Sequence, residues 1–437
     1  MRVQILVALI CLSSVFATTE NLSAQHVEIS RAMLESYMTK PDKDLFKVFH
    51  FTFAKSYSLN SEEAMVRYKL FKKAVKFIKK HNARNLSWTV GLNQFADMTN
   101  EEYDAHNGIT PEMLRKAERE HVAPRKDRDQ PDPLRKDRDE PDPVRGLKFL
   151  SSEKKTFLFD ELAQKVDDKV KHDCDEDKEK NDDHSDDSDG CDEKEEENDD
   201  GGHDKITNRD YFHNLTDVRN QGGCGSCWAF ATTCLLEAGY NFNNKLTGDN
   251  RVAPFSNQQL VDCDPKSSGC SGGWMPYALE QVKKQGGIAA ESNYAYKAVA
   301  GNCDAAKSNG LVKLKGKGYT GCAPYFGLNK CTREIFWTLM NENPCSVAID
   351  TKNSEFKYYQ SGIMDISKTS GCGNVTHAVM AFAWKHQKDD NNTIREYLSV
   401  RNSWGNRWGE QGDFRIYYDE KSETCKVTQF CIQPDWA

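Results

Sequence analysis

The sequence predicts an α+β protein, and two kinds of segment and one change in composition support that prediction. Trp228–Tyr240 is apolar on almost every helical face, which is typical of a buried helix. Residues 376–383 and 397–402 are short, mostly apolar runs, which are typical of strands. From about residue 205 to residue 437 the chain is rich in glycine, aromatic residues and cysteine, so we expect a compact domain there.

The negative charge of the chain is concentrated in one segment. The 437 residues include 67 acidic and 59 basic side chains, which gives a formal net charge of −8. Residues 172–204 alone contain twelve Asp and six Glu against three Lys, a net charge of −15, so the other 404 residues carry +7. This distribution excludes an acidic, disordered chain and a uniformly basic nucleic-acid-binding protein.

The N-terminus predicts entry into the secretory pathway. Arg2 precedes the apolar run 5–16, and the small residue Ala17 offers a cleavage site, so residues 1–17 have the order of a signal peptide. The run is too short for a membrane span, which takes about 20 residues, and no later segment is apolar enough. We therefore expect no membrane span, and a location in a lysosome-like acidic vesicle or outside the cell. Most of the 15 cysteines can form disulfides there.

Three regions follow the predicted signal peptide. Residues 18–107 contain helical patterning alternating with charge, at about 42–107. Residues 108–204 are polar and contain a decapeptide that occurs twice in tandem, at 125–144. Repeats of this composition cannot bury a core, so we expect a disordered, charged linker. Residues 205–437 are the predicted compact domain.

A candidate nucleophile lies at the start of the predicted helix. The stretch Gln221–Phe230 begins with a glycine-rich turn and places Cys227 in the first helical turn. Unpaired amides and the positive end of the helix dipole favour a thiolate over a thiol at that position. Three other interpretations remain open for the C-x-x-C pair Cys224 and Cys227: a structural disulfide, a dithiol redox pair and half of a zinc site.

His377 and Asn402 are the candidate base and the group that orients it. A cysteine nucleophile needs both partners. His377 stands at the start of the first apolar run, and Asn402 stands at the end of the second. If these runs are adjacent strands, the Asn402 carbonyl can hold one imidazole nitrogen while the other nitrogen faces Cys227. The pattern therefore predicts a Cys-His-Asn site.

Four motifs together resemble those of the papain-like cysteine proteases, the family that includes the cathepsins. They are Gln221–Phe230, the Cys-Ser-Gly-Gly of Cys270–Gly273, His377, and the stretch Asn402–Gly412 with two Trp-Gly pairs. The resemblance covers nearly all of residues 205–437. It implies an α+β fold with two subdomains, one helical and one β-barrel-like. It also implies a monomeric cysteine endopeptidase that acts on polypeptide substrates with no cofactor and no metal.

The resemblance implies roles for individual residues. Cys227 would attack the scissile carbonyl to form a thioester, and His377 would protonate the leaving amine. Asn402 would hold the imidazole, shielded by Trp404. The side-chain amide of Gln221 and the backbone amide of Cys227 would bind the oxyanion. The other residues implied to contact substrate are Gly272 and Gly273, which leave room for an extended strand, and those of an apolar pocket for the side chain two residues before the scissile bond, namely Trp274, Met275, Ala348, Val375 and Phe430.

The same resemblance suggests how the cysteines pair while Cys227 stays free. It implies the disulfides Cys224–Cys270, Cys263–Cys303 and Cys372–Cys425. Five cysteines of the compact domain are left over. Cys322 and Cys331 could close a short loop, and Cys234 is expected to be a buried free thiol. Cys345 and Cys431 stay unassigned.

The region before the linker resembles the propeptide of cathepsin L-like zymogens. Six residues lie three or four apart, on one face of a predicted helix: Glu63, Arg67, Phe71, Ala74, Ile78 and Asn82. The motif at residues 91–97, with Gly91, Asn93, Phe95 and Asp97, follows that helix. The resemblance implies a helical inhibitory propeptide that lies along the cleft in the reverse direction until it is removed.

The acidic run 172–204 has no counterpart in the family pattern. We expect a solvated linker, although Ser185–Glu196 loosely resembles a calcium loop. The run would lose charge towards pH 4 and expose the linker to cleavage in an acidic vesicle. An alternative function is a catalytically silent homologue that binds cations or serves as a storage protein. Asn214, Asn374 and Asn391 begin glycosylation sequons.

Overall fold

The computed structural model describes residues 32–122 and 209–437, apart from 305–309, 311, 366–367, 369–370, 389–392 and 420–422. The predicted signal peptide, the decapeptide repeat, the acidic run and Asn391 lie outside the described residues. Within the described residues, no helix combines the length and the apolar character that a membrane span requires.

Residues 32–122, which we call the N-terminal region, fold into helices and one short strand. They are α3 (Asp42–Thr52), α4 (Glu62–Asn82), β1 (Trp88–Val90), α5 (Asn100–Asp104) and α6 (Pro111–Val122). The predicted face of α4 is buried at Phe71, Ala74 and Ile78. Residues nearer the two ends of α4 form polar contacts. Arg67 pairs with Glu63 at 3.2 Å, and the Asn82 side chain exchanges two hydrogen bonds with the Val90 backbone.

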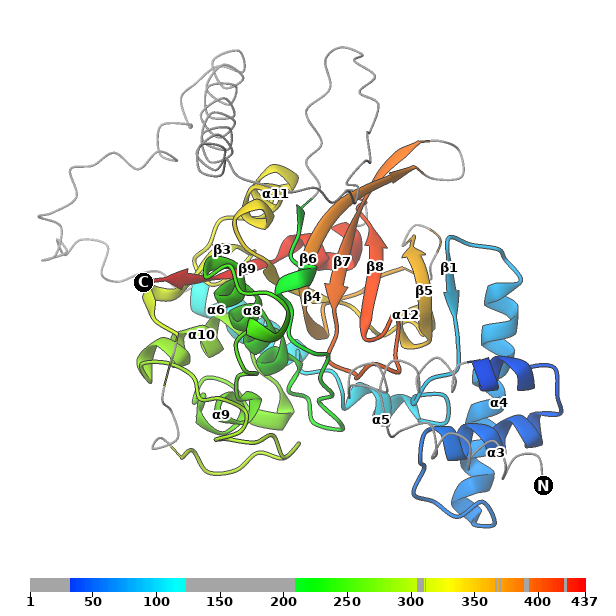
Figure 1. Ribbon diagram of the computed structural model, residues 1–437. Helices are drawn as coiled ribbons and strands as arrows, with labels where there is room; N and C mark the ends of the chain where they lie inside the picture. Colours follow the sequence, from blue (N-terminus) through cyan, green and yellow to red (C-terminus); the bar gives the residue numbers. More distant parts are fainter. Residues whose placement is uncertain are drawn as a thin grey trace, which may run out of the picture. The chain divides into compact units, whose positions relative to one another are not determined.

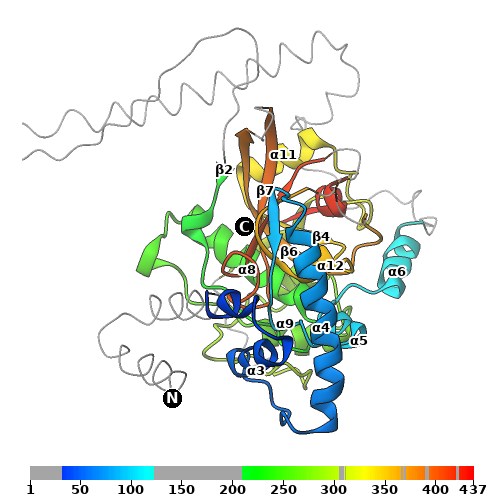
Figure 2. The same ribbon diagram turned by 90° about the vertical axis from the view of Figure 1, so that its right-hand side faces the viewer.

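Helix α6 falls inside the segment that we expected to be linker. Its apolar face is small: among residues 111–119, whose side chains the structure describes, Leu114 and Ala117 are the buried ones, and most of the others are polar. The Thr110 hydroxyl accepts a hydrogen bond from the Met113 amide and caps the first turn. The expected start of the linker at residue 108 therefore differs from the structure, in which ordered chain continues through α6. Figures 1 and 2 both show α6 apart from α3 and α4.

Three helices make up one half of residues 209–437. They are α8 (Cys227–Asn243), α9 (Asn257–Cys263) and α10 (Met275–Lys284), all drawn in green in Figure 1. Most side chains of α8 are buried on every face, as its sequence predicts. The helix starts at Cys227, so the fold presents that thiol at a helix N-terminus. Two further helices, α11 (Arg333–Glu342) and α12 (Ser354–Lys357), accompany the strands of the other half.

The other half is built on a nine-stranded sheet with the order β1-β5-β8-β7-β6-β4-β9-β3, with β2 paired to β6. Its bounds are β2 (Arg209–Asp210), β3 (Leu314–Cys322), β4 (Cys345–Ile349), β5 (Tyr359–Met364), β6 (His377–Lys388), β7 (Ile394–Arg401), β8 (Asp413–Tyr417) and β9 (Cys431–Trp436). The two predicted strands are present as β6 and β7, which pair antiparallel. His377 at the start of β6 and Asn402 just after β7 therefore lie at the same end of the sheet.

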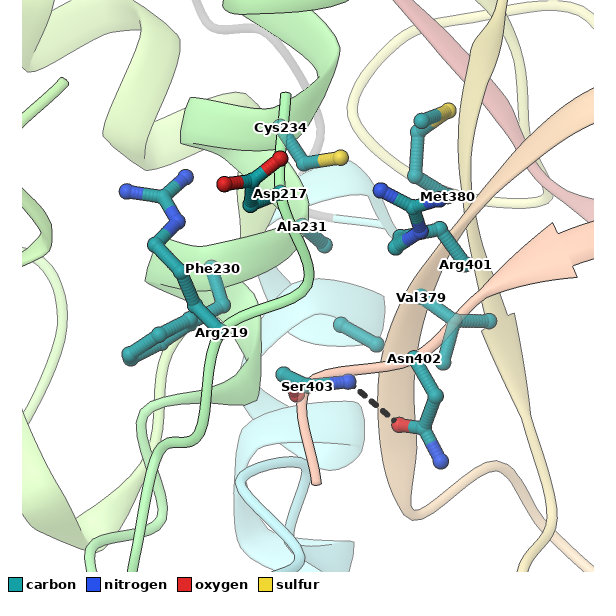
Figure 3. Close-up of a pocket in the computed structure, with 11 residues that line it drawn as sticks. Asp217, Arg219, Phe230, Ala231, Cys234, Val379, Met380, Arg401, Asn402 and Ser403 are labelled. Atoms are coloured by element: carbon teal, nitrogen blue, oxygen red, sulfur yellow. Dashed lines mark hydrogen bonds between the residues drawn. The ribbon is translucent and has the colours of Figure 1, made fainter. Parts of the chain in front are cut away.

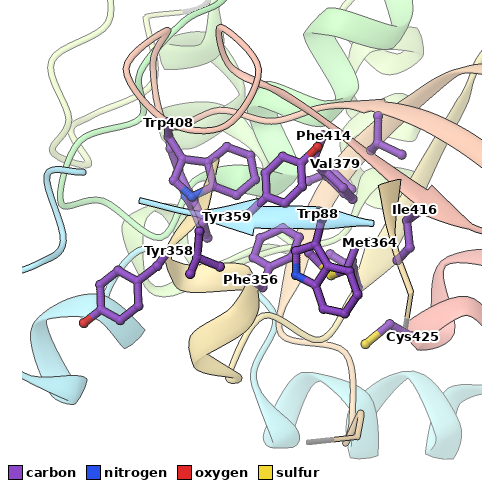
Figure 4. Close-up of a cluster of buried hydrophobic side chains, with 14 of the residues drawn as sticks. Trp88, Phe356, Tyr358, Tyr359, Met364, Val379, Trp408, Phe414, Ile416 and Cys425 are labelled. Carbon is purple, nitrogen blue, oxygen red and sulfur yellow. The ribbon is translucent and has the colours of Figure 1, made fainter. Parts of the chain in front are cut away.

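The N-terminal region shares a hydrophobic core with this sheet. Strand β1 pairs antiparallel with β5, and so extends the sheet at one end. Trp88 of β1 is buried in one cluster with Phe356, Trp408 and Phe414 (Figure 4). A second cluster joins residues of α8 and α10 to residues of β3, β4, β6 and β9. The N-terminal region is thus packed as part of the fold rather than attached through exposed contacts.

Five disulfides join the described part of residues 209–437. They are Cys224–Cys270, Cys263–Cys303, Cys322–Cys331, Cys345–Cys431 and Cys372–Cys425. Cys345 and Cys431, for which the sequence suggested no partner, join β4 to β9. Cys227 is free and buried, and Cys234 is free and partly buried. Since Cys224 pairs with Cys270, the redox-pair and local-disulfide interpretations of the C-x-x-C spacing are wrong.

Candidate active site

The Cys227 thiol is buried beneath the N-terminal region. Its Sγ accepts hydrogen bonds from the Gly108 amide at 3.2 Å and from the Ala378 amide at 3.3 Å. Burial raises the pKa of the thiol to about 11, although these amides and that of Trp228 act in the opposite direction. The helix start alone favours a thiolate, as we expected. In this covered state desolvation outweighs it, so the group is a thiol.

His377 and Asn402 meet as the sequence suggests. His377 Nε2 donates to Asn402 Oδ1 at 2.8 Å, and among the described residues His377 Nδ1 has no hydrogen-bond partner. The Trp404 ring lies against the imidazole, with 4.7 Å between the ring centroids. Burial lowers the pKa of His377 to about 4, while the Asn402 hydrogen bond opposes that shift. The imidazole is therefore neutral here, with Nδ1 left for a proton from the thiol.

Gln221 binds a carbonyl group of the N-terminal region. Its Nε2 donates to the carbonyl oxygens of His106 and Cys224, both at 2.8 Å. Its Oε1 accepts from the Ser403 hydroxyl at 2.6 Å, which fixes the orientation of the amide. The His106 oxygen thus lies at the distance at which an oxyanion donor holds its ligand. Ser403 was missed in the sequence; its position next to Asn402 was the available signal.

Gly272 and Gly273 both contact the backbone of the N-terminal region. The Gly273 amide donates to the Gly108 carbonyl at 3.0 Å. A Cβ atom on Gly272 would stand 2.3 Å from that same oxygen, and the φ of Gly272, +115°, is one that side-chain-bearing residues avoid. The extended chain can pair with this edge because Gly272 lacks a side chain. A Cβ atom on Gly273 would instead stand 2.5 Å from Ser267 Oγ and from the Trp228 ring, within the compact domain.

The five residues of the expected apolar pocket lie in one buried cluster, and Ile109 belongs to it as well. Trp274 and Phe430 stack at 5.9 Å between ring centroids. Ile109 is anchored there by its amide, which donates to the Thr376 carbonyl at 3.0 Å. The members from the compact domain are Trp274, Met275, Ala348, Val375 and Phe430.

A small cavity lies behind the histidine and asparagine, between α8 and the strands β6 and β7. Figure 3 shows Cys234 and Arg401 at one end of it and Asn402 and Ser403 at the other. The Ser403 amide donates to Asn402 Oδ1 at 2.8 Å, so this oxygen is held from two sides. Burial raises the pKa of Cys234 to about 12, which makes it an inert thiol. The described residues contain no group of three or more His, Cys, Asp or Glu that could hold a metal ion.

Two aromatic residues of the N-terminal region cover Trp404. Phe95 and Tyr103 lie edge-on to its ring at centroid distances of 5.0 and 5.6 Å. The Gln94 side chain donates to the Trp404 carbonyl at 2.8 Å. From residue 94 to residue 109 the chain therefore passes over Trp404, then over Cys227, and then reaches the apolar pocket.

Two protein-family models match the chain. The papain family cysteine protease model matches residues 203–434, which is more than half of the chain. The cathepsin propeptide inhibitor domain model matches residues 46–103.

The chain is also similar to curated plant proteins. It is 36% identical to the KDEL-tailed cysteine endopeptidase CEP2 of Arabidopsis thaliana and 40% identical to Vignain of Phaseolus vulgaris, over 225 residues in each case. Each match covers 50% of this chain and 56% of the relative. The chain therefore spans little more than half the length of these two relatives.

A solved structure matches both regions at once. Digestive procathepsin L2 proteinase from the larval midgut of Tenebrio molitor is 25% identical, with a TM-score of 0.60. The match covers 90% of this chain and 99% of that one.

Proposed function

The chain belongs to the papain family of cysteine proteases, and from that premise we propose that it is a cysteine endopeptidase made as an inactive precursor. The observation that carries the proposal is the occupancy of the site. His106, Gly108 and Ile109 bond to the groups that a peptidase would present to substrate. The N-terminal region thus acts as the propeptide, and we use that name from here on.

The geometry supports one mechanism once the propeptide has left. Loss of the cover hydrates the site, so the Cys227 proton can pass to His377 Nδ1 and leave a thiolate beside an imidazolium. The thiolate attacks the scissile carbonyl carbon, and Gln221 and the Cys227 amide hold the oxyanion. His377 then gives its proton to the departing amine as the C–N bond breaks and a thioester remains. Water, deprotonated by His377, attacks the thioester, which releases the acid product and restores the thiol.

Asn402 and Trp404 keep the imidazole in place throughout this cycle. Asn402 Oδ1 accepts the Nε2–H, which fixes the tautomer with Nδ1 free to exchange its proton. Oδ1 is itself fixed by the Ser403 amide. No cofactor is needed for any step, since every proton moves between Cys227, His377, substrate and water.

The propeptide resists cleavage because it runs in the direction opposite to a substrate. In a substrate, the residue two before the scissile bond fills the Trp274 pocket. Read from its N-terminus, the substrate chain therefore reaches that pocket first and Cys227 afterwards. The propeptide passes Cys227 at Gly108 and reaches the pocket afterwards, at Ile109. At the thiol it presents an amide N–H rather than a carbonyl carbon, so the thiol has no electrophile to attack.

The apolar pocket supports a preference for bulky aliphatic or aromatic side chains two residues before the scissile bond. Its lining is apolar, and the branched side chain of Ile109 is buried in the same hydrophobic cluster. A side chain of that size buries enough apolar surface to contribute about 1.5 to 3 kcal/mol. A charged side chain would lose hydration there without gaining a partner.

We place the site of action in the secretory pathway, in an acidic vesicle or after secretion. Five disulfides fit an oxidising compartment. Acid would also favour release of the propeptide, because burial lowers the pKa values of its residues His81 and His106. Each of these histidines binds a proton more readily once it is exposed.

The proposal is tested by comparing the precursor with its Cys227→Ala variant after exposure to acid. We expect a shorter product that hydrolyses peptides and that a peptidyl epoxide labels, and we expect neither activity nor labelling from Cys227→Ala. A Cys234→Ala variant is the matched control and should keep both. Peptide hydrolysis that persists in Cys227→Ala, or complete inactivity of the processed wild-type chain, would refute the proposal and favour the silent homologue.

A further inference from the structure

Lys357, the last residue of α12, is a buried cation. Only 6% of its surface is exposed, and burial lowers the pKa of its ammonium to about 8. Its Nζ donates to the Met98 carbonyl at 3.4 Å, a long hydrogen bond. Among the described residues no carboxylate forms an ion pair with it. Burial of a cation in this way is costly, so the fold tolerates an unfavourable arrangement here.

The propeptide supplies part of the cover over Lys357. The ammonium lies 4.8 Å from the centre of the Tyr103 ring and 5.5 Å from that of Tyr358. Met98 and Tyr103 both belong to the propeptide. When it leaves, the ammonium loses its hydrogen bond and one of its two aromatic neighbours, and it becomes accessible from the cleft.

Lys357 lies on the Trp404 side of the nucleophile. Its backbone carbonyl accepts from Trp408 Nε1 at 3.3 Å and from the propeptide residue Asn93 at 2.8 Å. The preceding Phe356 packs against Trp404 at 5.6 Å, and Trp404 packs against the catalytic imidazole. The apolar pocket around Trp274 lies past Cys227 along the propeptide path. A substrate with its acyl part in that pocket must therefore place its leaving-group part along Trp404, towards Lys357.

The propeptide itself places negative charge around this ammonium. Burial lowers the pKa of Lys357, whereas the charges of Asp104, Asp97 and Glu102 act to raise it. Asp97 is bound by Lys55 and Tyr57, and Glu102 is bound by Arg67. These two carboxylates are thus bound within the propeptide and are not partners of the ammonium.

We propose that Lys357 is a specificity-determining residue, and that the processed enzyme prefers peptides with Asp or Glu at the first or second position after the scissile bond. The inference rests on the proposed peptidase function and names a substrate class for it. A carboxylate at that place would give the ammonium the partner that the precursor lacks. An ion pair at the rim of a hydrated cleft is modest and salt-dependent, so we expect a preference of about three- to tenfold for Glu over Gln.

The experiment uses the full chain, processed by acid, with its active sites counted by epoxide labelling. Internally quenched peptides share a bulky apolar residue two before the cleaved bond, and carry Glu, Gln or Lys at the first or the second position after it. The value of kcat/KM is measured for each peptide at about pH 6, where Glu and Lys side chains are charged. Wild type, Lys357→Gln and the control Lys352→Gln are compared. Lys352 is an exposed lysine five residues away.

We expect the order Glu, Gln, Lys for wild type and for Lys352→Gln, and nearly equal values for Lys357→Gln. The Glu preference of the wild type should also shrink when salt rises from about 0.05 to 0.5 M. A wild-type ratio of Glu to Gln near one, or a ratio that survives in Lys357→Gln, would overturn the inference and leave the peptidase function standing. Absence of Cys227-dependent hydrolysis of every peptide would instead overturn the proposed function. The wild-type ratio and its salt dependence decide the matter even if Lys357→Gln fails to fold.

Discussion

Gly108→Ala should release the nucleophile from the propeptide without removing any side chain. A Cβ atom at position 108 would stand 2.2 Å from the Gly225 carbonyl oxygen and 2.9 Å from Cys227 Sγ. Ordinary contacts are longer by roughly 1 Å, and Gly225 O belongs to the backbone, so the propeptide must move away. The φ of Gly108 does not require glycine, so the effect is steric rather than conformational.

The displacement breaks three hydrogen bonds between backbone and site. They run from Gly108 N to Cys227 Sγ (3.2 Å), from Gly273 N to Gly108 O (3.0 Å) and from Ile109 N to Thr376 O (3.0 Å). At about 1 kcal/mol each, their loss weakens the inhibitory contact by about 2 to 3 kcal/mol. This corresponds to a propeptide that exposes Cys227 about 30 to 150 times more often.

The assay is the rate at which a peptidyl epoxide labels Cys227 in the intact precursor at neutral pH. Labelling of the full-length chain is followed by mass, so that processed molecules are not counted. We expect Gly108→Ala to be labelled about 30 to 150 times faster than wild type. Gly223→Ala is the control, since a Cβ atom there meets nothing within 4 Å. Labelling of Gly108→Ala at the wild-type rate would refute the reasoning, because the propeptide would then not be held by its backbone at Gly108.

Three further predictions concern the pH response, the oxyanion and the fold. Burial and the nearby Lys357 lower the pKa of His106. The stability that the neutral His106 side chain gives to the bound propeptide is therefore fully present above the free pKa of about 6.5, and it is lost as pH falls towards the lowered value. His106→Gln should therefore move the onset of acid processing to lower pH, by about half a unit on a gel time course, and an unchanged onset would contradict this. Gln221→Ala in the processed enzyme should lower kcat about 100- to 1000-fold with little change in KM, and a loss confined to KM would argue against oxyanion binding. Replacing Cys345 and Cys431 together by Ala should reduce the free energy of unfolding by about 2 to 4 kcal/mol, and an unaltered urea midpoint would show that β4 and β9 do not need the bridge.

The catalytic cluster could be predicted from sequence because its chemistry requires particular side chains at particular strand and helix ends. Cys227 is the first residue of a helix that is apolar on almost every face. His377 begins one apolar run, and Asn402 follows the other. These local patterns determine at which end of its helix or strand each side chain lies. That β6 and β7 are neighbours did not follow from them; it was the condition on which the predicted Cys-His-Asn site depended, and the structure meets it.

The contacts that block the site could not be predicted residue by residue. The propeptide contacts the site through the backbone of His106 and Gly108. Almost every residue has the same backbone amide and carbonyl, so the sequence does not show which of them form contacts. Helix α6 could not be predicted for a related reason, because its charged segment carries a narrow apolar stripe that includes the buried Leu114 and Ala117.

Long-range pairing accounts for the remaining differences. Cys345 and Cys431 are 86 residues apart, and the sequence left both unassigned, because nothing local shows that β4 and β9 are neighbours. Lys357 reads as an ordinary surface lysine in a helix, since its burial comes from the tertiary contact with Met98 and Tyr103. Sequence patterns report local periodicity, and neither of these features is local.

Active-site titration before and after processing measures directly how accessible Cys227 is. We expect one reactive thiol, Cys227, to be covered by residues 106–109 in the precursor and uncovered when the propeptide is removed. Titration with a peptidyl epoxide at neutral pH should find almost no reactive site in the intact precursor and close to one per chain after acid processing, with the label on Cys227. Full titration of the intact precursor would contradict the covering, and no titratable site after complete processing would contradict the peptidase itself.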